Sequence, residues 1–170
     1  SAFIALSEYS KDLHVRAGIP AERVHVRPNF LPDPLAGLTA PLPEGGAIFV
    51  GRLTPEKGVM TMLQAWERHG EDVSLTIVGD GPLRPDVEHA ARRMPIRMLG
   101  WLPHDRALLE VQKAAYVVFP SHWPEPFGRV VIEAMAFGRP VMAACHGAAA
   151  DTIVHGHTGW HVTPHEAEDL

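Results

Sequence analysis

Short apolar runs alternate with amphipathic stretches from residue 47 to the end of the chain. The apolar runs AIFV, VSLTIV, IRML, AYVVF, PVMAA and GWHV have the length and the β-branched content of buried strands. Between them the pattern predicts helices over 58–69, 83–94, 105–114 and 128–137, and a short helical turn near Asp151. Strands that alternate with helices in this way predict an α/β fold with a doubly wound, Rossmann-like parallel sheet covered on both faces.

The first part of the chain has a different pattern. Residues 2–6 predict a short strand, and residues 8–17 predict a modest helix that Gly18 and Pro20 bring to an end. Prolines and glycines are then frequent and periodic apolar positions are few between Pro28 and Gly46. This composition is typical of a linker or hinge.

These patterns divide the chain into three parts. We interpret 1–27 as the end of an N-terminal domain, 28–46 as an interdomain linker, and 47–170 as a Rossmann-like domain that is truncated at its C-terminus. The chain opens without Met inside an apolar run and closes on TPHEAEDL, which has the composition of a helix start. We therefore expect an excised piece of a longer protein.

Composition narrows the class of protein. With 170 residues, of which 46% are hydrophobic, the chain can bury a core of ordinary size. The net charge of -5 offers no general basic surface, so we expect no nucleic-acid partner. No apolar run approaches the roughly 20 residues of a membrane-spanning helix, and the chain is expected to be soluble.

Cys145 is the only cysteine, so no disulfide can form within the chain. A reducing, cytoplasmic compartment is the simpler interpretation. Because Cys145 ends the strand-like run PVMAAC, we expect a buried thiol that packs as a small hydrophobe and has no nucleophilic role.

Two cations lie in the loop GRLTPEKG, directly after the first strand of the predicted sheet. In parallel α/β sheets, ligands bind outside the carboxyl ends of the strands, where loops lead into helix N-termini. Arg52 and Lys57 therefore suit a diphosphate. The alternative is a pair of solvated charges, with Lys57 bound to Glu56 or Glu67. The glycines of the next such loop, GDGPL, are interpreted as structural turn residues.

The segment PSHWPEPFGRVVIEAMAFGRPV joins a buried strand to a helix and contains two glutamates. Glu133 interrupts the apolar run VVIEAMAF, and a charge among buried positions requires a ligand or an internal cation such as Arg52. Glu125 lies in the preceding loop, where the alternative is a solvated residue. Either carboxylate can accept two hydrogen bonds from a vicinal diol. The amides of Phe127, Gly128 and Arg129 lie at the helix start, where donors lack internal partners.

The run EPFGRVVIEAMAFGRPV, with seven residues between its two glutamates, resembles the signature of the retaining glycosyltransferases called group 1 or family 4. GRLTPEKG, LTIVGDGPL and LGWLP match the same family in the same order, and the resemblance covers the chain from about Phe3 to its end. It implies a GT-B fold of two Rossmann-like domains, of which this chain contains the C-terminal, donor-binding one. The stretch ALSEYSKDLHVRAGIPAERVHVRPNF resembles the crossover between the two domains.

The resemblance also implies roles for single residues. Arg52 and Lys57 correspond to the pair that binds the donor diphosphate, Glu133 to the glutamate that holds the ribose, and Glu125 to a contact of the transferred sugar. The backbone of Leu102 corresponds to a contact of the base. The amides of Phe127, Gly128 and Arg129 correspond to contacts of the sugar hydroxyls and phosphate.

The implied activity is transfer of a hexosyl group from a nucleotide diphosphate sugar to an acceptor hydroxyl with retention of configuration. We expect no cofactor and no metal, since cations and helix-terminal amides can oppose the charge of the leaving diphosphate. The acceptor, whether a sugar, a lipid or a small molecule, would bind through the other domain, which is also expected to carry the catalytic groups. Peripheral association of the full protein with a membrane is left open.

One position departs from the family pattern. HGAAADTIVHGHTG has Gly147 and Ala148 where the family has two glycines, and Asp151 where it has an acidic residue. Because alanine restricts positive φ, the fit of the donor to this loop is in question.

Three other hypotheses remain. A nucleotide-sugar-binding module that is inactive alone would use the same residues. A glycoside hydrolase would use Glu125 and Glu133 as its two carboxylates but leaves Arg52 and Lys57 without a role. Eleven histidines suggest a metal site, but His155, His157 and His161 lack matched ligands at suitable spacing, which favours surface or packing roles.

Overall fold

A six-stranded parallel sheet organises the chain in the computed structural model, which describes residues 1–37, 39–69 and 72–170. Its strands are β3 (Ala47–Val50), β4 (Leu75–Val78), β5 (Ile96–Gly100), β6 (Tyr116–Phe119), β7 (Val141–Ala144) and β8 (Gly159–Val162). Their spatial order is β5-β4-β3-β6-β7-β8. The first three strands extend to one side of the sheet and the last three to the other, which is the strand order of a Rossmann fold. The predicted fold class is confirmed.

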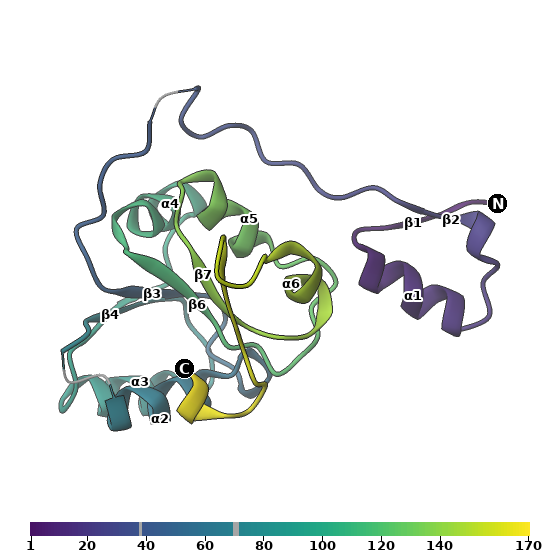
Figure 1. The fold of residues 1–170 in the computed structure, drawn as a ribbon. Coiled ribbons are helices and arrows are strands. Elements are labelled where there is room, and N and C mark those ends of the chain that lie inside the picture. The colour runs from purple at the N-terminus through teal and green to yellow at the C-terminus, as the bar shows by residue number, and fades with distance from the viewer. Residues whose placement is uncertain (38, 70–71) are drawn as a thin grey trace.

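Helices cover both faces of this sheet (Figure 1). On one face lie α2 (Val59–His69) and α3 (Arg84–Ala91), and on the other lie α4 (His104–Lys113), α5 (Arg129–Ala136) and α6 (Gly147–Thr152). The short 3₁₀ turn η2 (Pro55–Lys57) precedes α2, and a second one, η3 (Ala167–Asp169), is the last element. Neighbouring residues of β3 point to opposite faces, so that Phe49 packs into the α2–α3 core and Ile48 into the α4–α5 core.

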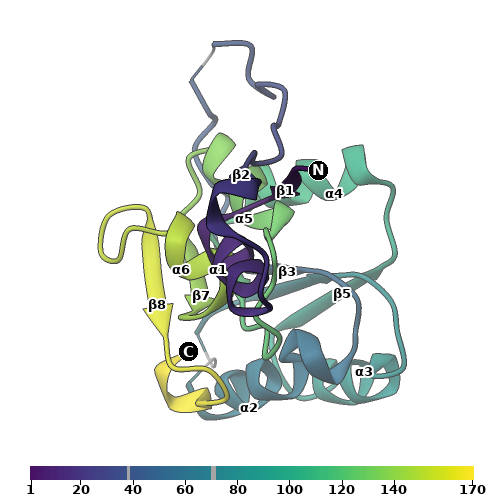
Figure 2. The same cartoon turned by 90° about the vertical axis from the view of Figure 1, so that its right-hand side faces the viewer.

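The N-terminal part forms a small unit of its own. Strands β1 (Phe3–Ala5) and β2 (Val24–Val26) pair in parallel around α1 (Glu8–Arg16) and the 3₁₀ turn η1 (Ala21–Arg23). The described part of 28–46 contains no helix or strand and crosses from this unit to β3 as one long connection (Figure 1). Viewed from the side of this unit, α1 lies in front of the sheet and close to α6, which it contacts (Figure 2).

Two expectations change with the structure. Cys145 is exposed, so the prediction of a buried thiol is wrong: β7 ends at Ala144, and the chain leaves the sheet one residue before the cysteine. Ala148 lies within α6 and Gly147 supplies the positive φ of +61° in this loop, so the alanine at the second position of the pair meets no backbone restriction. Among the described residues no helix is long and apolar enough to cross a membrane.

Candidate functional site

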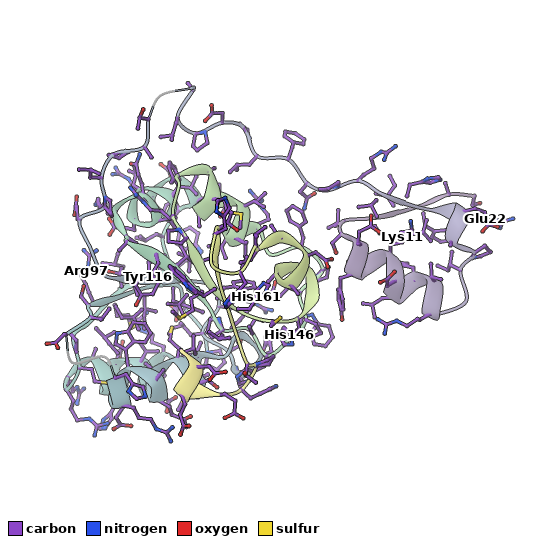
Figure 3. All side chains as sticks on the ribbon, viewed as in Figure 1. Lys11, Glu22, Arg97, Tyr116, His146 and His161 are labelled. Atoms are coloured by element: carbon purple, nitrogen blue, oxygen red, sulfur yellow. The ribbon has the colours of Figure 1, made fainter. Side chains whose placement is uncertain are left out.

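The candidate site lies where the strand order of the sheet reverses. Strand β3 leads toward α2 on one face and its neighbour β6 leads toward α5 on the other, so a crevice opens between the two loops that follow them. This end of the sheet faces the N-terminal unit. In Figure 3 it is marked by His146, just after β7, whereas Arg97 and Tyr116 lie at the opposite end, at the starts of β5 and β6.

The loops after β3 and β6 come into direct contact at Gly58. This residue has φ +70°, and a Cβ built on it would lie 1.9 Å from the carbonyl oxygen of Pro120. Only glycine fits here, because any other residue would push the two loops apart. The close approach brings Lys57 of the first loop to Glu125 of the second.

Lys57 and Glu125 form a hydrogen-bonded ion pair between Nζ and Oε1. Both side chains are largely buried, with 23% and 16% of their surfaces exposed. The hydroxyl of Ser121 donates to the same carboxylate oxygen at 3.2 Å. Lys57 is therefore paired with neither Glu56 nor Glu67, and Glu125 is not a freely solvated loop residue.

Arg52 lies at the rim of the crevice, with three quarters of its side chain exposed. Its guanidinium is 3.6 Å from Oε1 of Glu56. The backbone amide of Glu56 itself, and more weakly the charges of Arg52 and Lys57, lower the pKa of that carboxyl. The alternative that Arg52 pairs with Glu133 is wrong, since His104 and Arg129 contact that carboxylate instead.

Glu133 lies in the second turn of α5, as predicted, and its side chain is only 8% exposed. Nε2 of His104 is 2.9 Å from its Oε1, and a guanidinium nitrogen of Arg129 is 3.3 Å from the same atom. Arg129 is four residues earlier on the same helix, whereas His104 begins α4. The buried carboxylate is thus stabilised from two elements, in agreement with the need for a partner that the sequence predicts.

A cleft of about 350 Å³ adjoins these residues at the carboxyl ends of β3, β4 and β5. Arg52 and Leu102 lie in its wall together with His104, whose ring also contacts Glu133. Its lining consists of Val50, Gly51, Arg52, Val78, Gly79, Asp80, Trp101, Leu102, His104 and Ala107. His104 therefore links the cleft to the buried carboxylate of Glu133.

The loop before α5 is held in place by α6. The amide of Ala148 donates to the carbonyl oxygen of Glu125 at 2.9 Å, and Gly147 packs against the backbone of Pro124 and Glu125. Gly128, with φ +74°, begins α5 without a side chain that could cap it. The cap residue of α5 therefore supplies no side-chain acceptor at this helix start, where Phe127, Gly128 and Arg129 were predicted to offer their amides.

His104 is the residue that sequence reasoning missed. It directly follows the LGWLP motif and is one of many histidines, so only its position before a predicted helix could have marked it. The hydroxyl-bearing residues Ser7 and Ser10 were likewise missed; they contact the loop before α5 from the N-terminal unit.

Four of the other histidines form two pairs of neighbouring rings outside the cleft. The rings of His155 and His161 are 5.8 Å apart, and those of His122 and His165 are 3.9 Å apart. Burial lowers the pKa of His122, and electrostatic interaction with the nearby His165 and His146 lowers it further. Over residues 1–37, 39–69 and 72–170 no three His, Cys, Asp or Glu side chains are arranged to hold a metal ion.

Residues 38–170 match the model of the family "Glycosyl transferases group 1". Among curated proteins, the chain is 33% identical over 130 residues to glycogen synthase of Mycobacterium tuberculosis, covering 72% of this chain and 31% of that protein. It is 30% identical to alpha-D-kanosaminyltransferase of Streptomyces kanamyceticus, covering 100% of this chain and 49% of that protein. The chain thus spans between about a third and a half of the length of these relatives.

Solved structures agree with this match. The crystal structure of Anabaena Alr3699/HepE in complex with UDP and glucose superposes with a TM-score of 0.83 at 27% identity, covering 100% of this chain and 51% of that one. The apo form of the lipopolysaccharide outer core galactosyltransferase WaaB has the same TM-score, 0.83, at 23% identity, and supports the fold alone. The fold is that of one half of a GT-B enzyme.

Proposed function

Since the chain belongs to the glycosyl transferases of group 1, we propose that it is the donor-binding half of an enzyme that transfers a hexosyl group from a nucleotide diphosphate sugar to an acceptor hydroxyl. One observation carries the proposal. At the reversal of the strand order, two cationic side chains and a buried carboxylate surround a crevice that continues into a cleft of about 350 Å³. UDP and glucose in the similar Anabaena structure support the choice of UDP and UDP-glucose as probes.

Each part of the donor has a matching part of the site. The cleft beside Leu102 takes the base, and Glu133 accepts hydrogen bonds from the ribose hydroxyls. The diphosphate lies at the mouth of the crevice, where Arg52 and Lys57 supply charge and the start of α5 supplies amide donors. Lys57 then exchanges its bond with Glu125 for one with phosphate, which leaves the Glu125 carboxylate to contact a sugar hydroxyl.

The same groups favour the chemical step. Transfer breaks the bond between the anomeric carbon and a phosphate oxygen, and negative charge develops on the departing diphosphate. Once Lys57 has turned to the bound phosphate, Arg52, Lys57 and the N-terminus of α5 oppose this charge, so the proposal requires no metal ion. The acceptor binds in the other half of the enzyme, and closure of the two halves excludes water. Retention of configuration is part of the proposal and rests on the resemblance of the EPFGRVVIEAMAFGRPV motif.

Two other functions are weaker. A glycoside hydrolase needs two carboxyl groups that flank one scissile bond, but Glu125 is paired with Lys57 and Glu133 with His104 and Arg129, in two separate networks. Hydrolysis of aryl glucosides without nucleotide would favour that hypothesis. A binding module that is inactive alone remains compatible with the same site, because the acceptor side belongs to the other half.

Calorimetric titration of the chain with UDP tests the proposal. The double variant Arg52→Ala/Lys57→Ala is expected to bind UDP at least about 100-fold more weakly than the wild type, because each hydrogen bond between a charged group and phosphate contributes about 1.5–3 kcal/mol. UDP should also raise the unfolding temperature of the wild type, since a ligand of the native state stabilises it by mass action.

A matched control removes two charges elsewhere. Lys11 lies on α1, and Arg93 forms only an exposed contact of 3.9 Å with Glu67. The variant Lys11→Ala/Arg93→Ala should therefore bind UDP like the wild type. If the wild type binds neither UDP nor another nucleoside diphosphate, or if both double variants weaken binding equally, the proposal is wrong.

A further inference from the structure

Two serines of the N-terminal unit reach the loop that carries Glu125. The hydroxyl of Ser7 donates to the carbonyl oxygen of Pro126 at 2.7 Å, and the hydroxyl of Ser10 reaches the same oxygen at 3.2 Å. More than a hundred residues of sequence separate the two sides of this contact. Pro126 directly follows Glu125, so the contact lies one residue from the proposed sugar contact.

Both serines are buried, with 8% and 6% of their surfaces exposed. A buried hydroxyl is costly unless it is hydrogen-bonded, and a carbonyl oxygen has two lone pairs that can accept both bonds. Ser7 has a second task, because its Oγ accepts the amide of Ser10 at 3.1 Å and so caps α1. The start of α1 and the carbonyl of Pro126 are therefore fixed to each other.

The loop is consequently held from two sides. From α6 the amide of Ala148 bonds the carbonyl of Glu125, and from α1 the serines bond the next carbonyl along. Helix α1 is itself attached to α6, since the amide of Tyr9 donates to Asp151 at 2.9 Å. Two successive carbonyl groups are thus fixed in direction, which determines where the Glu125 side chain and the amide of Phe127 point.

We propose that Ser7 and Ser10 are positioning residues of the donor site: by holding the carbonyl of Pro126, they orient the preceding residue, Glu125, toward the sugar of the donor. This inference rests on the proposed function. It implies that the sugar is fully held only while α1 is seated on the loop, so movement of the N-terminal unit changes the sugar contact and leaves the base and ribose contacts in place.

The test combines hydrogen exchange with nucleotide binding. Ser10→Ala removes one donor, and Ser7→Asp/Ser10→Ala removes both while Asp keeps the ability to cap α1. Backbone exchange over 125–128, measured by mass spectrometry without ligand, should accelerate about fivefold in the double variant because hydrogen bonds of ordinary strength are lost. The affinity for UDP-glucose should fall about tenfold, with that for UDP unchanged within about twofold.

Ser7→Thr is the rescue variant, since threonine both caps a helix and donates a hydrogen bond; it should exchange and bind like the wild type. Asp12→Ala, at an exposed position of the same helix, controls for a change in helix stability. Unchanged exchange over 125–128 in the double variant overturns the proposal. So do equal losses of UDP and UDP-glucose affinity, or a wild type that binds the two equally. A wild type that binds neither refutes the proposed function, and the exchange data still decide whether the serines hold the loop.

Discussion

At the scale of single residues, Glu133 is the group whose environment constrains function most. Its carboxylate is 8% exposed in an apolar helix, and both His104 and Arg129 contact one of its oxygens, Oε1. The guanidinium of Arg129 opposes this charge, the ring of His104 lies against the same oxygen, and the carboxylate can accept further hydrogen bonds from a diol. A neutral amide at this position would keep the shape and lose the charge.

Glu133→Gln is therefore expected to weaken UDP binding about tenfold, because one charge-assisted acceptor is lost. The wild type should prefer UDP to 2′-deoxy-UDP, and the variant should lose most of this preference. Calorimetric titration with both nucleotides measures the ratio. Glu88→Gln, which alters an exposed carboxylate paired with Arg84 on α3, is the control. A preference that survives Glu133→Gln unchanged would assign the ribose to another residue.

The sequence revealed that Glu133 needs a partner but did not identify it. A charge in VVIEAMAF is visible from the local pattern, and so is the proximity of Arg129, one helical turn earlier. His104 and the pairing of Lys57 with Glu125 could not be predicted in the same way. These contacts join separate loops, and their partners depend on how the crossover helices place those loops at one edge of the sheet.

At the scale of elements, Gly147 joins α6 to the loop that carries Glu125. It has φ +61°, and a Cβ on it would lie 2.7 Å from the amide nitrogen of Glu125. Gly156 has φ +75° but nothing within 4 Å of the corresponding Cβ position. Substitution of each glycine by alanine therefore distinguishes the free-energy cost of backbone strain alone from the additional cost of displacing the loop.

Gly156→Ala is expected to lower the free energy of unfolding by about 1 kcal/mol, the cost of a left-handed alanine. Gly147→Ala should lower it by about 3 kcal/mol, because the backbone of Pro124 and Glu125 must also move. Urea unfolding followed by circular dichroism measures both values. Equal losses in the two variants would mean that the loop adapts without cost and that α6 does not fix it.

Element types were predictable from the pattern of apolar positions, and element ends were less so. All six strands of the sheet follow the apolar runs because buried parallel strands need them. The strand β2 was missed because VHV is short and includes a polar residue. The burial of Cys145 was mispredicted because the apolar run continues one residue past Ala144, where β7 ends.

At the scale of the whole molecule, the sheet domain has a core of its own. Both hydrophobic clusters of the described residues are built from β3 onward, with Leu35 as the single contribution from the preceding connection. The N-terminal unit touches the domain through polar contacts of α1, namely those of Ser7, Ser10 and Tyr9. The doubly wound parallel sheet was expected from the alternation of strands and helices. The docking of α1 was not, since its sequence does not indicate which distant carbonyl group its serines contact.

Deletion of residues 1–27 should therefore leave a cooperatively folded domain. The unfolding temperature is expected to fall by no more than about 5 °C, because few apolar contacts are lost, and UDP affinity should stay within about twofold of the wild type. Scanning calorimetry and titration with UDP measure both quantities. Exchange over 125–128 should accelerate as in the serine variants, since the same two bonds to Pro126 are absent. Loss of cooperative unfolding would show instead that the N-terminal unit contributes to the core, and the division of the chain at 28–46 would then have to be redrawn.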